Sequence, residues 1–317
     1  MGRGKSPSPY LERREKMSRR KYHLSLRKRQ LTLAFFFITI PTFLMILFIY
    51  YPLIFGVKIS FYQYDMVGES IFIGLRNYIE LLKDPLFWNA FKNSLLYLLV
   101  VPPLQIISML LAVLVDKAIK GRNLFRTLIF LPVVTPITIA AITWQWMYRE
   151  KGFINFLLRS LHITDKSISF LSDPNIALFA IMFVTMWKGF GYYMVIYLAG
   201  LQSIPRELLE AAKVDGARPS QVFFKVTMPL LKPYILFCST MSSIAALNVF
   251  GEIYAMTKGG PAHATETMGL FIYNKAFGYL QFGYSNAAAI LFSFVVIAFS
   301  LLNFYIFREG GLKSYYA

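Results

Sequence analysis

Long apolar runs alternate with polar segments along the chain. Five runs of 19 to 24 residues contain no charged residue: 31–52, 93–115, 127–148, 233–251 and 284–307. A sixth, residues 174–205, carries only Lys188. About 20 apolar residues are enough for a helix to cross the hydrocarbon core of a bilayer. None of the runs alternates with the period of two that is typical of a membrane β-barrel. The pattern predicts an all-α, polytopic membrane protein with six transmembrane helices.

Positive charge is distributed unevenly between the polar segments of this chain of 317 residues and net charge +17. If the N-terminus is cytosolic, the segments on that side hold 22 Lys and Arg in 82 residues, against 10 in 97 residues on the other side. Cytosolic segments of membrane proteins are enriched in Lys and Arg. We therefore expect a basic cytosolic tail at 1–30, a membrane domain at 31–307 and a cytosolic C-terminus at 308–317.

The basic tail contains 11 Lys and Arg in its 30 residues. We expect it to lie near anionic lipid headgroups, and an arm that binds nucleic acid is the alternative. The single cysteine, Cys238, lies in the fifth run, so no disulfide can form within the chain. A lone cysteine in such a run is expected to be a small buried hydrophobe.

Prolines interrupt two of the predicted spans. Pro102-Pro103 lies in the second run, and Pro132 and Pro136 lie in the third. A broken backbone is tolerated in a membrane where protein covers it or where it lines a cavity. Simple kinking of the helices is the alternative interpretation.

Several residues indicate where spans meet the outer membrane interface. Asp84 followed by Pro85 predicts a helix start, with Trp88 in the aromatic belt. Trp144, Trp146 and Tyr148 at the end of the third run are also expected at this interface.

The polar segment between the fourth and fifth runs predicts a short amphipathic helix outside the lipid. Pro205 suits the first turn of a helix, and Gly216 is a natural C-terminal stop. Leu208, Leu209 and Ala212 share one face, which leaves the other face free for a partner.

This segment resembles the EAA loop of importer-type ABC transporter permeases, whose pattern is E-A-A-x3-G-x9-I-x-L-P. The chain has Glu210-Ala-Ala212, Gly216 and Val226-Thr-Met-Pro229 at the family spacing, with Val226 in place of Ile and Met228 in place of Leu. Other stretches are similar to the carbohydrate-uptake branch of these permeases, namely residues 74–78, 121–126, 130–132, 198–205, 257–261 and 265–267. The resemblance, to the maltose-permease and glycerol-phosphate permease types, covers about residues 31 to 307.

The resemblance implies the importer-type permease fold and a place in a bacterial inner membrane. It implies a pore-forming subunit that passes a saccharide, in particular an oligosaccharide, and leaves open whether that oligosaccharide is neutral or acidic. It also implies four kinds of partner: a second related permease, an ATPase homodimer that holds ATP and Mg, an external solute-binding protein and membrane lipid. The chain itself has no Gly-x4-Gly-Lys-Ser/Thr loop, so we expect neither enzyme activity nor a cofactor in it.

The EAA loop, residues 201–229, would receive the motion of the ATPases. Its expected coupling residues are Glu207, Glu210, Ala211, Ala212, Asp215 and Gly216. An ordinary interfacial helix is the alternative.

The resemblance also suggests a substrate path along the fourth and fifth spans. Gly189, Tyr192 and Ser242 match residues that line the sugar site of the maltose-permease type, and Asn248 is the remaining asparagine nearby. Ala245, Ala246 and Val249 occupy the face where the family has its asparagines. Packing of helices through small residues is the alternative for each position.

Lys188 is the sole ionisable residue deep in a predicted span, which makes it a candidate for the substrate path. It could neutralise an acidic substrate, such as a uronate oligosaccharide or a phosphorylated polyol, or it could snorkel or pair with Glu252. A secondary sugar transporter that works without ATP is the second functional hypothesis. It is disfavoured because no Asp or Glu lies inside the runs and Glu252 is placed at a span's end. His23, His162 and His263 are too dispersed for a metal-dependent intramembrane enzyme.

Overall fold

The structure is a computed structural model that describes residues 29–31, 33–64, 70–116 and 121–307. It divides into two compact units, Met1–Lys58 and Ile59–Ala317, and each is described by itself. Nearly all of the predicted tail 1–30 and the whole predicted C-terminal segment 308–317 lie outside the described residues.

The first unit is built on one long apolar helix, Arg29–Ile59. This helix includes a π-helical turn, η1 (Ile46–Tyr50), which continues into α2 (Tyr51–Ile59). No side chain in its most apolar window is buried. A helix that is apolar all round belongs in a protein core or in lipid. Because this helix is uncovered, its surface suits a hydrocarbon environment.

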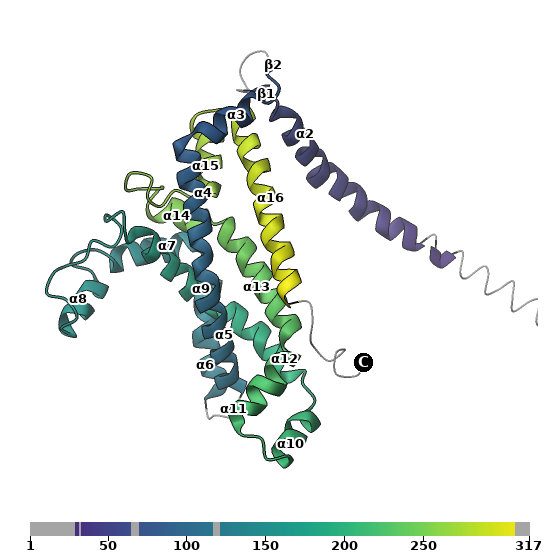
Figure 1. Ribbon diagram of the computed structural model, residues 1–317, viewed down its shortest axis with the longest axis vertical. Helices are drawn as coiled ribbons and strands as arrows, with labels where there is room; N and C mark the ends of the chain where they lie inside the picture. Colours follow the sequence, from purple (N-terminus) through teal and green to yellow (C-terminus); the bar gives the residue numbers. More distant parts are fainter. Residues whose placement is uncertain (1–28, 32, 65–69, 117–120, 308–317) are drawn as a thin grey trace, which may run out of the picture. The chain divides into compact units, whose positions relative to one another are not determined.

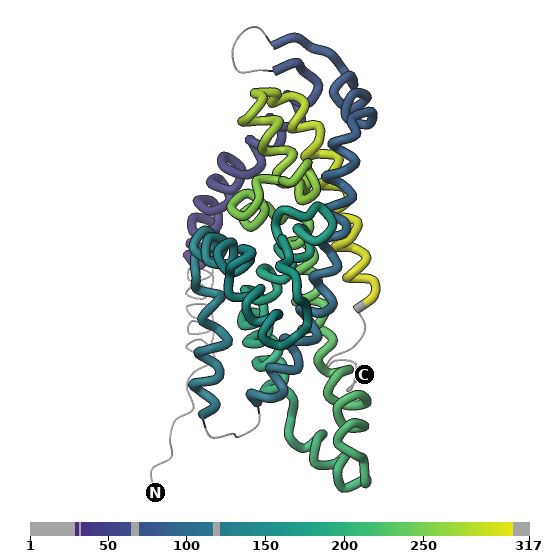
Figure 2. Tube along the Cα trace, turned by 90° about the vertical axis from the view of Figure 1, so that its left-hand side faces the viewer, coloured from purple at the N-terminus to yellow at the C-terminus, as the bar shows by residue number. Residues whose placement is uncertain are grey.

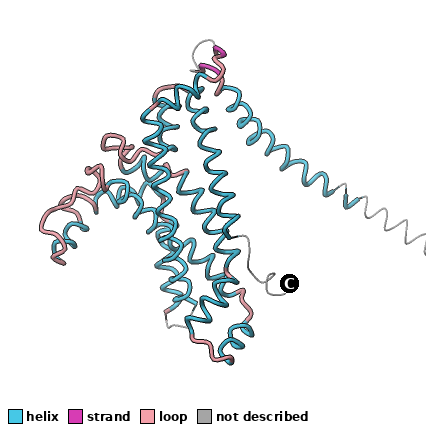
Figure 3. Tube along the Cα trace, viewed as in Figure 1, coloured by secondary structure: helices cyan, strands magenta, loops and turns pink. Residues whose placement is uncertain are grey.

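The second unit is almost entirely helical (Figure 3). Its first half contains α3 (Arg76–Lys83), α4 (Pro85–Tyr97), the 3-10 turn η2 (Leu98–Val100), α5 (Val101–Asp116), α6 (Arg122–Val134), α7 (Ile137–Met147), α8 (Phe153–Ser160) and α9 (Ala177–Gln202). Its second half contains α10 (Arg206–Val214), α11 (Pro219–Val222), the π-helical turn η3 (Phe223–Thr227), α12 (Met228–Leu230), α13 (Lys232–Leu247), α14 (Gly251–Met256), α15 (Met268–Tyr273), the π-helical turn η4 (Asn274–Gly278) and α16 (Phe282–Phe307). Two short antiparallel strands, β1 (Tyr62–Gln63) and β2 (Ile71–Phe72), place Tyr62 opposite Phe72.

Helix α9 is the centre of this unit and packs against α5 and α6, while α13 packs against α16. Both views place α3 and α15 at one end of the unit and α10 and α11 at the other (Figures 1 and 2). Helix α5 ends, and α6 begins, at the same end as α10. The segments expected in the cytosol between spans therefore gather at one end of this unit, as the predicted topology requires.

The candidate membrane spans agree with the predicted apolar runs. Within the described residues, four helices are long and apolar enough to cross a bilayer: Arg29–Ile59, Pro85–Asp116, Ala177–Gln202 and Phe282–Ile306. Two bent pairs pass the same test, α6 with α7 at 98° and Pro219–Leu230 with Lys232–Leu247 at 67°. If each bent pair is one span, the six predicted runs are all accounted for.

Two of the predicted proline interruptions are wrong. Pro102-Pro103 lies in the first turn of α5, directly after the 3-10 turn η2, where the missing N–H groups are tolerated, and Pro85–Asp116 continues as one span. Pro132 lies inside α6. The third span breaks instead at Pro136, which precedes α7. The residue before a proline avoids the helical conformation, and Thr135 is accordingly extended, with ψ of 126°.

Of the three aromatic residues expected at the outer interface at the end of the third run, two lie inside the protein. Trp144 and Tyr148 are buried, because they pack against Trp187 and Phe170 rather than facing the interface. The distances between ring centroids are 5.4 Å and 4.9 Å, respectively. Trp146 is the exposed member of the set.

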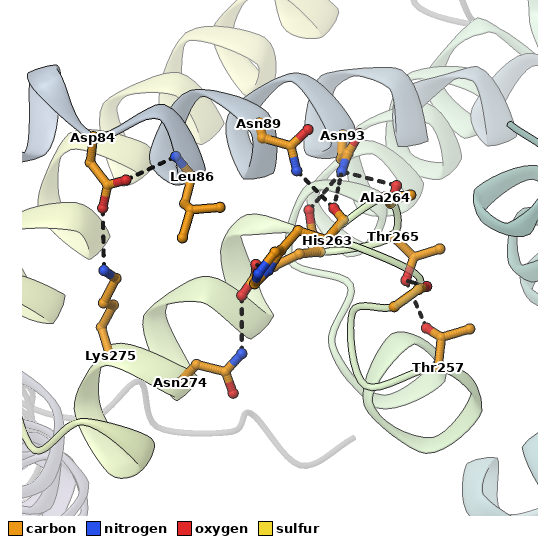
Figure 4. Close-up of polar contacts among 12 residues, drawn as sticks. Asp84, Leu86, Asn89, Asn93, Thr257, His263, Ala264, Thr265, Asn274 and Lys275 are labelled. Carbon is orange, nitrogen blue, oxygen red and sulfur yellow. Dashed lines mark hydrogen bonds and ion pairs between the residues drawn. The ribbon is translucent and has the colours of Figure 1, made fainter. Parts of the chain in front are cut away.

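A hydrogen-bonded loop covers the start of the second span at the end of the unit opposite α10 (Figure 4). The Asn93 side chain in α4 donates to the carbonyl oxygens of Glu266, at 2.9 Å, and Ala264, at 3.1 Å. The hydroxyls of Thr257 and Thr265 bond to each other at 2.7 Å across the loop. These contacts show that two of the family-like stretches, 257–261 and 265–267, form one fixed loop.

Asp84 joins three elements at this end. Its Oδ1 accepts the Leu86 N–H at 2.8 Å, which caps α4 and confirms the predicted helix start. Its Oδ2 accepts hydrogen bonds from Lys275 Nζ, at 3.2 Å, and from the Tyr284 hydroxyl, at 2.9 Å. Partial burial raises the pKa of the Asp84 carboxyl, but these donors and the Lys275 charge outweigh burial and leave the pKa below its usual value.

Gly191 allows α9 to lie directly against α6. A Cβ at this position would collide with the carbonyl oxygen of Ile129 and would lie 2.9 Å from the Cα of Phe130, which are backbone atoms that cannot give way. Gly189, two residues earlier, differs, because its nearest neighbour is the end of the Leu104 side chain at 3.0 Å. Small residues permit this close approach of helices within membranes.

We predict that Asp84→Ala lowers the stability of the protein by about 1–3 kcal/mol at neutral pH, since it removes a cap and a partly buried ion pair. The pKa of the Asp84 carboxyl is lower in the folded protein than in the unfolded chain. The stability that this carboxylate contributes is therefore complete above the unfolded pKa of about 3.9, and it is lost as the pH falls through the folded pKa. Thermal unfolding of the detergent-purified protein between pH 3 and pH 7 measures this. Glu80→Ala, which removes the exposed Arg76–Glu80 pair, is the control and should change little. An equal effect of the two variants would contradict the role given to Asp84.

We predict that Gly191→Ala destabilises the packing of α6 on α9 by roughly 1–3 kcal/mol, because the backbone of α6 must move. Gly189→Ala is the matched control and should be tolerated, since the Leu104 side chain can rotate. The thermal midpoints of the two purified variants decide the matter. A Gly191→Ala protein as stable as the unsubstituted one would show that the helices do not depend on this contact.

Candidate functional site

The predicted amphipathic helix is α10, and its ends are those expected from the sequence. Pro205 precedes its first residue, and Asp215 occupies the C-cap position. Gly216 adopts a left-handed conformation with φ of +78°. The Gly216 N–H bonds to Lys213 O, and the Ala217 N–H bonds to Ala212 O, each at 3.0 Å. This pair of bonds is a Schellman motif, which ends a helix sharply.

One face of α10 is anchored to the membrane helices. Leu208 and Leu209 pack onto a buried cluster formed by Ile204, Leu230 and Leu231, as the predicted apolar face requires. This cluster combines the chain just after α9 with the start of α13. Leu208 and Leu209 thus connect α10 to the ends of both spans.

The other face of α10 is open. Five of the expected coupling residues are exposed and Ala212 is half-buried; the exposed ones are Glu207, Glu210, Ala211, Asp215 and Gly216. Two large apolar side chains near them are also uncovered, Val214 with 87% of its surface exposed and Phe224 with 64%. Exposed apolar groups beside charged ones are typical of a surface that contacts another protein.

A cavity of about 490 Å³ lies between α9 and the segment that runs from α13 into α14. All five residues predicted for the substrate path line it: Lys188, Gly189, Tyr192, Ser242 and Asn248. The structure thus brings together residues that are up to 60 positions apart in the sequence. Val100, Leu104 and Phe250 add apolar wall, so the cavity combines polar groups with apolar surface. That combination suits a ligand with both hydroxyl groups and apolar ring faces.

Lys188 is held by the broken end of the third span. Its Nζ donates to the carbonyl oxygens of Thr135, at 2.9 Å, Val133, at 3.0 Å, and Pro132, at 3.4 Å. These carbonyls lie at the C-terminus of α6, where the helix dipole favours a positive charge. The ion pairs among the described residues do not include one between Lys188 and Glu252, which was an alternative expected from the sequence.

Ser242 is buried and its hydroxyl is already engaged. It donates to the Cys238 carbonyl oxygen at 2.7 Å and accepts a hydrogen bond from Gln105 Nε2 at 2.8 Å. Gln105 Oε1 in turn accepts the Tyr197 hydroxyl at 2.8 Å. The network joins α5, α9 and α13 within the core. Sequence analysis missed Gln105, although an amide inside an otherwise uncharged span is a recognisable sign of an interhelical hydrogen bond.

Tyr192 and Asn248 are the more accessible polar residues of the cavity. Tyr192 is 42% exposed, and its ring meets that of Tyr193 edge-on with centroids 5.1 Å apart. The Asn248 amide nitrogen donates one of its two N–H groups to Ile244 O at 2.9 Å, which leaves the second N–H and the amide oxygen for other partners.

Glu252, which the sequence places at a span's end, also lines the cavity. Helix α13 stops at Leu247, four residues before the expected end of the fifth run at Gly251, and the chain turns into α14 from Gly251. That turn carries the carboxylate to the cavity wall. The early stop is not visible in the hydrophobic pattern.

The family model for the inner membrane component of binding-protein-dependent transport systems matches residues 105–308. A probable ABC transporter permease of Bacillus subtilis, YurN, is 36% identical over 86% of this chain and 94% of its own length. The lactose transport system permease LacF of Rhizobium radiobacter is 35% identical over 84% of this chain and 91% of its own length. The trehalose/maltose permease MalF of Thermococcus litoralis is 32% identical over 87% and 94%.

The fold is also similar to that of a solved chain. A chain from the crystal structure of a bacterial alginate ABC transporter, in complex with an alginate pentasaccharide-bound periplasmic protein, superposes with a TM-score of 0.76. The match covers 89% of this chain and 97% of the other, at 24% identity, and so supports the fold alone. The family match and the identities across most of the length agree with the bent spans and the exposed α10. The chain belongs to the family of binding-protein-dependent transport system inner membrane components.

Proposed function

We propose that this chain is the pore-forming permease of an ATP-driven importer for a saccharide in a bacterial inner membrane. The observation that supports the proposal most strongly is the convergence of the five predicted substrate-path residues on one cavity between the bent fifth span and α9. The relatives named for lactose and for trehalose/maltose agree with a saccharide substrate.

The coupling mechanism follows from the way α10 is attached. Two ATPase subunits, holding ATP and Mg, would close on nucleotide binding, and α10 would move with the subunit that it contacts. Glu210 would make the charged contact, while Ala211 and Ala212 allow close approach. Because Leu208 and Leu209 are anchored beside both α9 and α13, that motion would reach the two helices that wall the cavity. The spans would then alternate between states open to either side of the membrane.

The remaining partners are assigned by the same logic. A second related permease would complete the pore, and an external solute-binding protein would deliver the saccharide at the end formed by α3 and α15. The alginate transporter, whose permease resembles this chain in fold, was solved with a periplasmic protein bound. Selection among saccharides would occur first on that external protein.

We predict that Glu210→Lys lowers ATP-dependent uptake about tenfold or more while the assembled complex stays in the membrane, because the charge at the ATPase contact is reversed. Asp165→Lys is the matched control, since it reverses an exposed carboxylate in the loop between α8 and α9, which belongs neither to α10 nor to the end formed by α3 and α15. Uptake by membrane vesicles and co-purification of the ATPase measure the two effects. Full uptake by the Glu210→Lys complex would contradict the coupling role.

We predict that Gly216→Pro likewise abolishes uptake, because proline cannot adopt the φ of +78° that ends α10. Gly216→Asn is the control. Asparagine tolerates the left-handed conformation, and no atom lies within 4 Å of the position of its Cβ. Transport by Gly216→Asn should stay within about threefold of the unsubstituted complex. Equal transport by the proline and asparagine variants would show that the shape of this turn does not matter.

A further inference from the structure

We infer that a groove between α5 and α6 holds one anionic phospholipid of the cytosolic leaflet. The groove has a volume of about 500 Å³, which lies in the range of about 300–1,000 Å³ typical of ligand sites. The inference goes beyond the proposed function, because it concerns a ligand that is not transported. Seven residues line this α5–α6 groove: Leu111, Leu114, Val115, Arg122, Phe125, Leu128 and Ile129.

The α5–α6 groove starts at the end of the unit that carries α10. Helix α5 ends there at Asp116, and α6 begins there at Arg122 (Figures 1 and 2). The uneven distribution of Lys and Arg along the chain places this end in the cytosol. From Arg122 the lining extends along α6 to Ile129, which is roughly 10 Å at 1.5 Å per residue. The groove therefore leads from the level of the lipid headgroups into the hydrocarbon of the cytosolic leaflet.

The walls of the groove are apolar apart from Arg122. Leu114 on α5 and Phe125 and Leu128 on α6 are exposed, so their side chains are open to an acyl chain. Lipid tails are as apolar as leucine, so such walls accept the chain of any phospholipid without preference. A preference for one class of lipid must therefore come from the polar end of the groove.

Arg122 supplies that polar end, and Arg126 adds a second charge one turn farther along the same side of α6. Both side chains are half-buried, and neither forms a hydrogen bond or an ion pair with another residue that the structure describes. A guanidinium carries five N–H donors in a planar fork that matches a phosphate group. Arg126 lies deeper by roughly 6 Å, which a long arginine side chain can span to reach the headgroups. Both arginines thus have donors available for a lipid phosphate.

The charge around the groove favours an anionic lipid over a zwitterionic one. Residues 116–126 contain four Lys and Arg against one acid, Asp116. Phosphatidylglycerol carries a net negative charge, whereas phosphatidylethanolamine adds an ammonium group that Arg122 and Arg126 repel. Basic pockets between membrane helices on the cytosolic side bind anionic headgroups in the same way. The inference gives a role to the family-like stretch 121–126, which the coupling helix and the substrate cavity leave without one.

The test is native mass spectrometry of the assembled transporter in detergent, titrated with phosphatidylglycerol or with phosphatidylethanolamine of the same acyl chains. We expect the first phosphatidylglycerol to bind at least about fivefold more tightly than phosphatidylethanolamine. Arg122→Gln and Arg126→Gln should each weaken phosphatidylglycerol binding about fivefold, because each removes one charge near the headgroup. Arg159→Gln is the matched control, since it removes an exposed arginine from α8, and it should leave binding unchanged.

A second pair of variants tests the apolar part of the groove. Leu128→Trp fills the groove and keeps both arginines, so it should also weaken phosphatidylglycerol binding, by about threefold or more. Leu131→Trp is its control, because Leu131 is equally exposed on α6 but lies outside the lining. A photoreactive group on the acyl chain of phosphatidylglycerol should crosslink to residues 111–129.

Three results would overturn the inference. The first is equal binding of the two lipids, and the second is unchanged phosphatidylglycerol binding in both arginine variants. The third is a photoreactive amino acid at position 128 that crosslinks to the second permease instead of to lipid, which would show that protein covers the groove. Saccharide uptake enters none of these measurements, so each result would leave the proposed function standing.

Discussion

Every backbone carbonyl within the hydrocarbon core needs a donor, and the third span breaks that rule at Thr135 and Pro136. The break deprives the last carbonyls of α6 of their usual partners one turn further along the helix, although Pro132 O still accepts the Thr135 N–H at 3.3 Å. The ammonium of Lys188 in α9 supplies the missing donors. A single side chain thus permits a 98° bend within one apolar run and fixes α6 against α9, where Gly191 lets the two backbones approach. The cavity wall depends on this arrangement.

Helix α9 links the two functional regions. Its middle carries Lys188, Gly189 and Tyr192 on the cavity wall, and its C-terminal end leads to Ile204 in the cluster that holds α10. Helix α13 repeats the connection, from Leu231 in that cluster to Ser242 in the cavity. Helices α9 and α13 therefore contact the same cluster beside α10 at one end and line the same cavity farther along. A movement of α10 could reach the cavity through these two helices without any chemical step in this chain. That is the division of labour expected of a permease driven by separate ATPases.

The sequence predicted the features that depend on local pattern. The apolar runs, the helix start at Asp84 and the left-handed stop at Gly216 follow from length, capping and backbone preference, and the structure confirms them. It did not predict features that depend on pairing between distant elements. The donors of Lys188 are used by carbonyls more than 50 residues away. Gln105 joins the core network and Glu252 lines the cavity because of the positions of α5 and α14 in the fold. The periodicity of apolar residues does not predict those positions. The sequence could not show that Trp144 is buried, because the side chains that pack against it belong to α9.

The proposed coupling depends on the membrane topology, because α10 can contact an ATPase only if it lies in the cytosol. The native cysteine, Cys238, is buried and gives a low labelling background. A membrane-impermeant maleimide applied to intact spheroplasts should label Glu80→Cys in α3 and leave Glu210→Cys in α10 unlabelled until the membrane is opened. Labelling of Glu210→Cys from outside intact spheroplasts would contradict the account.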